Sequence, residues 1–192
     1  MKHLQAALAV LILTAASATV EAQAGIGIKA GLSYGNVSNS GALPGNVSQR
    51  SGFAVGAGAT IGSPIGLAIE ALYAQRGVVS AVAGASRKLN YFDVPVYLRV
   101  SLPVPTVSPF VYAGPQASFE LGCESPGGSC PSGRPKTTYA GVIGGGLRFS
   151  SLHGISLDAR YIYGLTDLKL STISTTKSYQ TRSFMLLAGI GI

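Results

Sequence analysis

The chain has 192 residues, of which 47% are hydrophobic and only 11% are charged, and its formal net charge is +7. About a quarter of the residues in a soluble domain are charged, so this composition speaks against an ordinary soluble domain. After the N-terminal segment no stretch has 18 uninterrupted apolar residues, which excludes transmembrane helices.

Residues 1–22 have the pattern of a secretory signal peptide. A short basic start precedes an apolar run, Leu4–Val20, and small residues at Ala22 and Ala24 offer cleavage sites. We expect cleavage after Ala22, or after Ala24, so that residues 23–192 form one domain. The alternative is an N-terminal membrane anchor, which the small and hydroxyl residues late in the run disfavour.

The rest of the chain alternates apolar residues with glycine, alanine or polar residues at every second position. This period is the signature of β-strands with two different faces. Eight segments show it: Gly25–Ser38, Ser51–Ile61, Gly66–Arg76, Leu89–Leu102, Phe110–Leu121, Thr138–Phe149, Ile155–Lys169 and Ser183–Ile192. The pattern predicts an all-β fold, an eight-stranded antiparallel up-and-down transmembrane β-barrel with its apolar face toward lipid.

The connections between these segments are short and long in turn. Short turns are expected at Gly62–Pro64, Pro103–Pro109 and Ser150–Gly154, and the other connections are longer polar loops. Bacterial barrels of this kind keep short turns in the periplasm and long loops outside the cell. The alternative is a soluble barrel of lipocalin type, but the less apolar face has too few charges for a solvated exterior.

Charged residues at inward-facing strand positions are balanced in this prediction. They are four cations and four anions: Lys29, Arg99, Arg148, Arg160, Glu70, Asp93, Glu120 and Asp158. A buried charge is costly unless it is paired, and an eight-stranded barrel is about wide enough for side chains to fill it. We therefore expect a neutral plug and a sealed lumen. The alternative is a narrow porin-like channel for small solutes.

The remaining charges gather at the end that carries the long loops. The nine cations of this rim are Arg50, Arg76, Arg87, Lys88, Arg134, Lys136, Lys169, Lys177 and Arg182. Only Glu124 and Asp167 oppose them. Such a field attracts anions, so the expected partners are outer-membrane lipid, lipopolysaccharide and an acidic extracellular ligand. The alternative is that a basic rim simply anchors the barrel in an anionic leaflet.

Two cysteines, Cys123 and Cys130, flank a short loop segment. In an exported protein this spacing favours a disulfide. A metal site lacks ligands, since the only histidine after the signal segment is His153. A hydrolase triad of His153, Asp158 and a serine is disfavoured, because the histidine is expected in a turn and the aspartate in the lumen. We expect no catalytic residues, metal or cofactor, and no nucleic-acid partner.

Several short segments in order resemble the outer-membrane β-barrel domain of the "porin family" proteins, which include PorT-like proteins of Bacteroidetes-type bacteria. The segments that carry the resemblance are Gly27–Tyr34, Glu70–Tyr73, Leu89–Pro95, Phe110–Pro115 and Asp158–Leu165. The resemblance covers essentially the whole chain after the signal segment. It implies a barrel in the outer membrane of a Gram-negative bacterium, and it supplies no catalytic residues. We expect a monomeric surface-interaction or structural scaffold.

Overall fold

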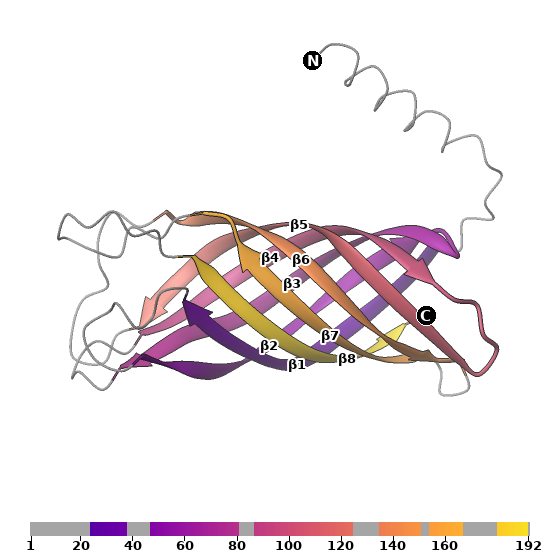
Figure 1. Cartoon of the computed structure of the whole chain (residues 1–192), viewed down its shortest axis with the longest axis horizontal. Helices are drawn as coiled ribbons and strands as arrows, with labels where there is room; N and C mark the ends of the chain where they lie inside the picture. Colours follow the sequence, from indigo (N-terminus) through magenta and orange to yellow (C-terminus); the bar gives the residue numbers. More distant parts are fainter. Residues whose placement is uncertain are drawn as a thin grey trace, which may run out of the picture.

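The computed structural model describes residues 24–37, 47–80, 87–124, 135–150, 154–166 and 180–191. Eight strands account for nearly all of them: β1 (Ala24–Val37), β2 (Val47–Ile61), β3 (Ile65–Ser80), β4 (Arg87–Ser101), β5 (Val107–Glu124), β6 (Thr137–Phe149), β7 (Ile155–Gly164) and β8 (Thr181–Gly191). Each strand pairs antiparallel with the next, and β8 pairs with β1, so the sheet closes into a barrel (Figure 1). The predicted fold class is confirmed.

The strands differ from the predicted ones mainly at the ends that carry the longer connections. β2 begins at Val47 and β3 continues to Ser80, and the two ends pair with each other beyond an irregularity in register. The polar sequence there predicts a loop, yet backbone pairing continues through it. At the seventh strand the difference is opposite, because β7 ends at Gly164. The predicted signal peptide lies outside the described residues.

The two faces of the barrel wall have opposite chemistry. On β3, Ile69 keeps 50% of its side chain exposed, whereas its neighbour Glu70 keeps 4%. The same alternation recurs on β7, where Leu157 and Tyr161 face outward and Arg160 is buried. The apolar side chains therefore form the outer surface and the charged ones the interior. Within the described part of the chain, no helix has the length and apolarity to cross a membrane.

The barrel has two different ends. At one end, which we call the turn end, short connections join β2 to β3, β4 to β5 and β6 to β7. There the amide of Ser101 donates to the carbonyl of Pro64 at 2.7 Å, and the amide of Leu102 donates to that of Pro109 at 2.9 Å. The opposite end is the loop end. The turn between β4 and β5 lies at the right of Figure 1.

Candidate functional site

Four charged side chains meet inside the barrel, and we call them the central quartet: Lys29, Glu70, Asp158 and Arg160. Lys29 Nζ lies 2.7 Å from Glu70 Oε1 and 2.7 Å from Asp158 Oδ2. Arg160 Nη1 lies 2.8 Å from Glu70 Oε2, and its Nη2 lies 3.4 Å from Asp158 Oδ1. Two cations and two anions thus neutralise one another, as burial requires.

Two tyrosines complete the hydrogen bonding of the quartet. Tyr97 donates its hydroxyl to Glu70, and Tyr112 donates to Asp158 Oδ1 at 2.9 Å. The two rings stack with their centroids 4.4 Å apart, and the guanidinium of Arg160 lies 5.4 Å from the Tyr112 centroid. Both carboxylates therefore accept several charge-assisted bonds in a buried setting, which fixes their positions strongly.

Glycines on the neighbouring strands, directly opposite in register, make room for these large side chains. A Cβ atom on Gly144 would lie 2.5 Å from Cζ of Tyr112, and a Cβ on Gly58 would lie 2.6 Å from Cγ of Glu70. Such distances are shorter than any ordinary contact. Gly144 is thus part of the interior packing, as is Gly146, where a Cβ would lie 2.8 Å from Cβ of Asp158.

A methyl group at Gly144 should therefore disturb the interior. We expect Gly144→Ala to lower the free energy of unfolding by about 1–3 kcal/mol, the usual cost of overpacking. The matched control is Gly141→Ala on the same strand, because a Cβ there would meet nothing within 4 Å. Urea unfolding in lipid vesicles should show the control within about 0.5 kcal/mol of the parent. Equal effects of the two changes would contradict the packing argument.

The sequence predicts Arg76 as one of the rim cations, but the structure places it inside the barrel. Its side chain is buried and pairs with Asp93 of β4, which is itself completely buried. Arg76 lies on the same face of β3 as Glu70, and β3 continues four residues past it, so it lies below the rim. The prediction that Arg76 belongs to the basic rim is therefore wrong.

The charges expected to balance across the whole lumen do so only in part. Arg99 and Arg148 lie toward the turn end, and among the described residues neither forms an ion pair with a carboxylate. Arg99 instead donates from Nε to Ser101 Oγ at 3.2 Å and covers the ring of Phe110 at 3.8 Å. Glu120 lies near the loop end, half-buried and opposite Tyr91 in the β4–β5 register.

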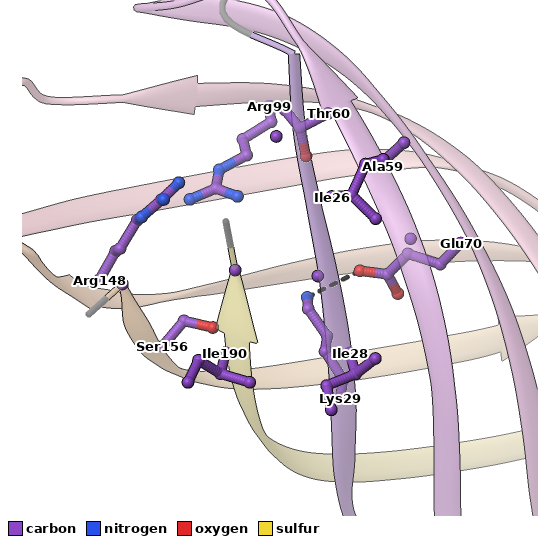
Figure 2. Close-up of a pocket in the computed structure, with 15 residues that line it drawn as sticks. Ile26, Ile28, Lys29, Ala59, Thr60, Glu70, Arg99, Arg148, Ser156 and Ile190 are labelled. Carbon is purple, nitrogen blue, oxygen red and sulfur yellow. Dashed lines mark ion pairs between the residues drawn. The ribbon is translucent and has the colours of Figure 1, made fainter. Parts of the chain in front are cut away.

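A cavity of about 60 Å³ opens beside these two arginines. Its lining includes Thr60 and Ser156 as well as Lys29 of the quartet (Figure 2). Neither hydroxyl residue carries a sequence signal, since each is one small polar residue in an alternating strand. The cavity depends on the register of strands far apart in the chain, which the alternating pattern does not specify.

At the loop end the structure describes only part of the basic rim. Lys88 Nζ lies 3.5 Å from a carboxylate oxygen of Glu124, Lys136 is exposed, and Arg182 lies 5.4 Å from the ring centroid of Tyr163. Arg50 lies near the loop end of β2, and Arg87 is the first residue of β4. The rim residues that fall outside the described residues are Arg134, Lys169, Lys177 and the acidic Asp167.

The structure describes only one of the two cysteines and not the histidine that the sequence analysis considered. Cys123 lies near the end of β5, whereas Cys130 lies outside the described residues, so the disulfide stays a prediction. His153 also lies outside them. Among the residues that the structure describes, no three His, Cys, Asp or Glu side chains gather as metal ligands.

The family follows from a sequence match that spans nearly the whole chain. Residues 6–191 match the model of the family described as "Outer membrane protein beta-barrel domain". The chain belongs to this family. Its closed eight-stranded sheet and apolar outer surface are those of an outer membrane protein β-barrel domain. No curated protein sequence matches the chain.

Solved structures of other outer membrane proteins are similar to this outer membrane protein β-barrel domain. Neisserial surface protein A is 14% identical, covers 88% of this chain and 96% of its own, and has a TM-score of 0.59. Ail of Yersinia pestis is 17% identical, covers 88% and 98%, and has a TM-score of 0.48. The outer membrane enzyme PagL is 16% identical, covers 85% and 98%, and has a TM-score of 0.49. At so low an identity, Neisserial surface protein A indicates the fold alone.

Proposed function

We propose that this chain is an integral protein of the bacterial outer membrane, with a closed interior and a basic loop end that binds anionic surface groups. In this proposal it is a structural or surface-interaction scaffold and performs no catalysis. The observation that carries the proposal is the central quartet, which fills the middle of the barrel with mutually neutralised side chains. The narrower relationship to PorT-like proteins, export by the predicted signal peptide and a monomeric state are parts of the same proposal.

The packing of the interior supports its closure. The side chain of Arg160 is fully buried at the quartet. Buried apolar side chains also fill the interior, namely those of Leu72, Val142, Ile162, Met185 and Leu187. Along β3 and β4, the buried Arg76–Asp93 pair and Tyr91 lie closer to the loop end than Glu70 and Tyr97 do. A path for water or ions along the axis would have to displace several of these side chains.

The outer surface supports residence in a membrane. Large apolar side chains are exposed on all eight strands, for example Ile28, Leu67, Ile143 and Leu186. A soluble protein rarely exposes so extended an apolar surface. With the short connections in the periplasm, as is usual for such barrels, the loop end and its basic residues face the cell exterior.

The first experiment is the conductance of the purified, refolded protein in a planar bilayer. We expect no reproducible channel openings from a preparation that is demonstrably folded, because in this proposal the quartet and the buried apolar side chains close the interior. Steady openings that change when Arg160 or Asp158 is replaced would favour the narrow channel instead. Openings of that kind would contradict the closed interior.

A second prediction concerns the loop end. Neutralising four rim cations, by the changes Arg87→Gln, Lys88→Gln, Arg134→Gln and Lys136→Gln, should weaken binding to lipopolysaccharide vesicles. We expect a loss of at least about tenfold at low salt, because each basic residue near an anionic lipid surface contributes about 1 kcal/mol.

The matched control keeps all four charges and changes only their chemistry, by Arg87→Lys, Lys88→Arg, Arg134→Lys and Lys136→Arg. It should bind like the parent, and added salt should weaken both, since exposed charges are screened. Unchanged binding by the neutralised variant would remove the rim from the proposed function.

A further inference from the structure

The turn end of the barrel contains a cavity that the proposed function does not use. The cavity of about 60 Å³ lies between the quartet and the outside, and Lys29, Thr60, Arg99, Arg148 and Ser156 line it. It opens toward a wider mouth of about 960 Å³, which Arg99 and Arg148 also line together with residues of the short turns. A cavity of about 10–15 Å³ already holds one water molecule, so this cavity has room for a small polyatomic ion.

Two cations of this cavity, Arg99 and Arg148, form no ion pair with a described carboxylate. Figure 2 shows the side chains of Arg99 and Arg148 reaching into the same space, close enough for their charges to act on each other. The nearest lining carboxylate, Glu70, is already bound by Lys29, by Arg160 and by the hydroxyl of Tyr97. Among the described residues, no carboxylate forms an ion pair with either arginine, and Glu70 and Asp158 act on Arg99 from beyond ion-pair distance.

The arrangement has an electrostatic cost that a ligand can remove. Like charges repel more strongly in a partly buried site than in bulk water. Within the described part of the chain, Arg99 donates a hydrogen bond from Nε to Ser101 Oγ, which leaves both terminal nitrogens as donors. A guanidinium presents such donors in a planar fork that matches the oxygens of a carboxylate or a phosphate.

We propose that the turn-end cavity is a binding site for an oxyanion, a carboxylate or a phosphate group, held between Arg99 and Arg148. The hydroxyls of Thr60 and Ser156 are further hydrogen-bond donors in its lining. An anion between the two arginines attracts both of them, and these two attractions offset the repulsion between the arginines. In the topology proposed above, the mouth faces the periplasm, so the ligand reaches the site from that side and not from the cell surface.

The test is a titration of the refolded protein, in nonionic detergent and a buffer without oxyanions, with inorganic phosphate in one arm and acetate in the other. Isothermal calorimetry or ligand NMR line broadening reports binding. We expect saturable binding by the parent protein, and at least tenfold weaker binding by the double variant Arg99→Gln, Arg148→Gln, since the strong charge-assisted bonds are lost. Binding of phosphate alone, acetate alone or both identifies which oxyanion group the site accepts.

Two further variants separate binding from folding. The double variant Arg99→Lys, Arg148→Lys retains both charges and should recover part of the binding that the glutamine variant loses. Ser63→Ala changes an exposed residue in the wall of the wider mouth and should bind like the parent. Heat-dependent gel mobility confirms that each barrel is folded.

A second measurement does not depend on a binding signal. A ligand that binds only the folded state raises its apparent stability, so phosphate or acetate should shift urea unfolding of the parent but not of the glutamine variant. Equal binding or equal stabilisation of parent and glutamine variant overturns the proposal. The absence of saturable binding by the parent in both arms also overturns it.

Discussion

Replacing Arg160 with methionine is expected to lower the free energy of unfolding by about 3–5 kcal/mol, the usual cost of breaking a buried ion pair. The change removes the cation that bonds both Glu70 and Asp158. Among the described residues, Lys29 then remains the one cation in an ion pair with the two buried carboxylates, so one negative charge is left without an ion-pair partner. The loss in free energy of unfolding is measured by urea unfolding in lipid vesicles, with heat-dependent gel mobility as the readout of the folded fraction.

The control for this change is Arg182→Met at the loop end. Arg182 is exposed and contacts only the ring of Tyr163 in the described structure, so its loss should cost at most about 1 kcal/mol. A double variant that also carries Glu70→Gln should recover part of the Arg160 loss, because it removes the uncompensated charge. Equal stability of Arg160→Met and Arg182→Met would mean that the quartet is not a buried network.

The second large effect is expected on the outer wall. Leu186 lies near the middle of β8 with 45% of its side chain exposed, and Leu186→Arg should cost about 2–4 kcal/mol in lipid vesicles. The reason is that the charged side chain must enter the hydrocarbon of the bilayer. Urea unfolding of the vesicle-inserted barrel gives the value directly.

The control is Val104→Arg, which places an arginine in the turn between β4 and β5. Val104 is exposed there, and the cost of arginine falls to about 0–1 kcal/mol near the membrane interface. A small effect at both positions would mean that the apolar wall does not face lipid. A large effect at both would mean that the membrane covers the turn end.

The two faces of each strand could be predicted because alternation is local. Ile69 and Glu70 are neighbours, and their opposite chemistry alone determines which one points toward the interior once the outside is apolar. The same argument identified Arg160 and Asp158 as interior residues. A fold with one repeating element and closed pairing needs little more than this pattern.

Partners across the interior could not be predicted, because they depend on register and on how the barrel closes. Arg76 bonds Asp93, although its direct partner in the β3–β4 register is Leu89. A count of charges predicts that anions and cations balance. It does not reveal that the quartet is neutral by itself while Arg99 and Arg148 are left at the turn end.

Strand ends were less predictable for a different reason. Pro109 lies within β5 opposite Leu147, although proline was expected to keep that segment in a turn. A proline lacks only the N–H donor, and its carbonyl can still take part in pairing. Likewise the polar residues Ser48 and Gln49 pair with β3, because backbone hydrogen bonds do not require apolar side chains.

The bonds of the central quartet join parts of the chain that are far apart in sequence. Lys29 and Asp158 are separated by 129 positions, and Arg160 and Glu70 by 90. Contacts between such distant residues form slowly, because much of the intervening chain must be ordered first. Until β7 joins the sheet, Glu70 has only Lys29 and Tyr97 as partners within the quartet and its tyrosines. We therefore expect the bonds of the quartet to be completed late in folding, together with the closure of the sheet itself.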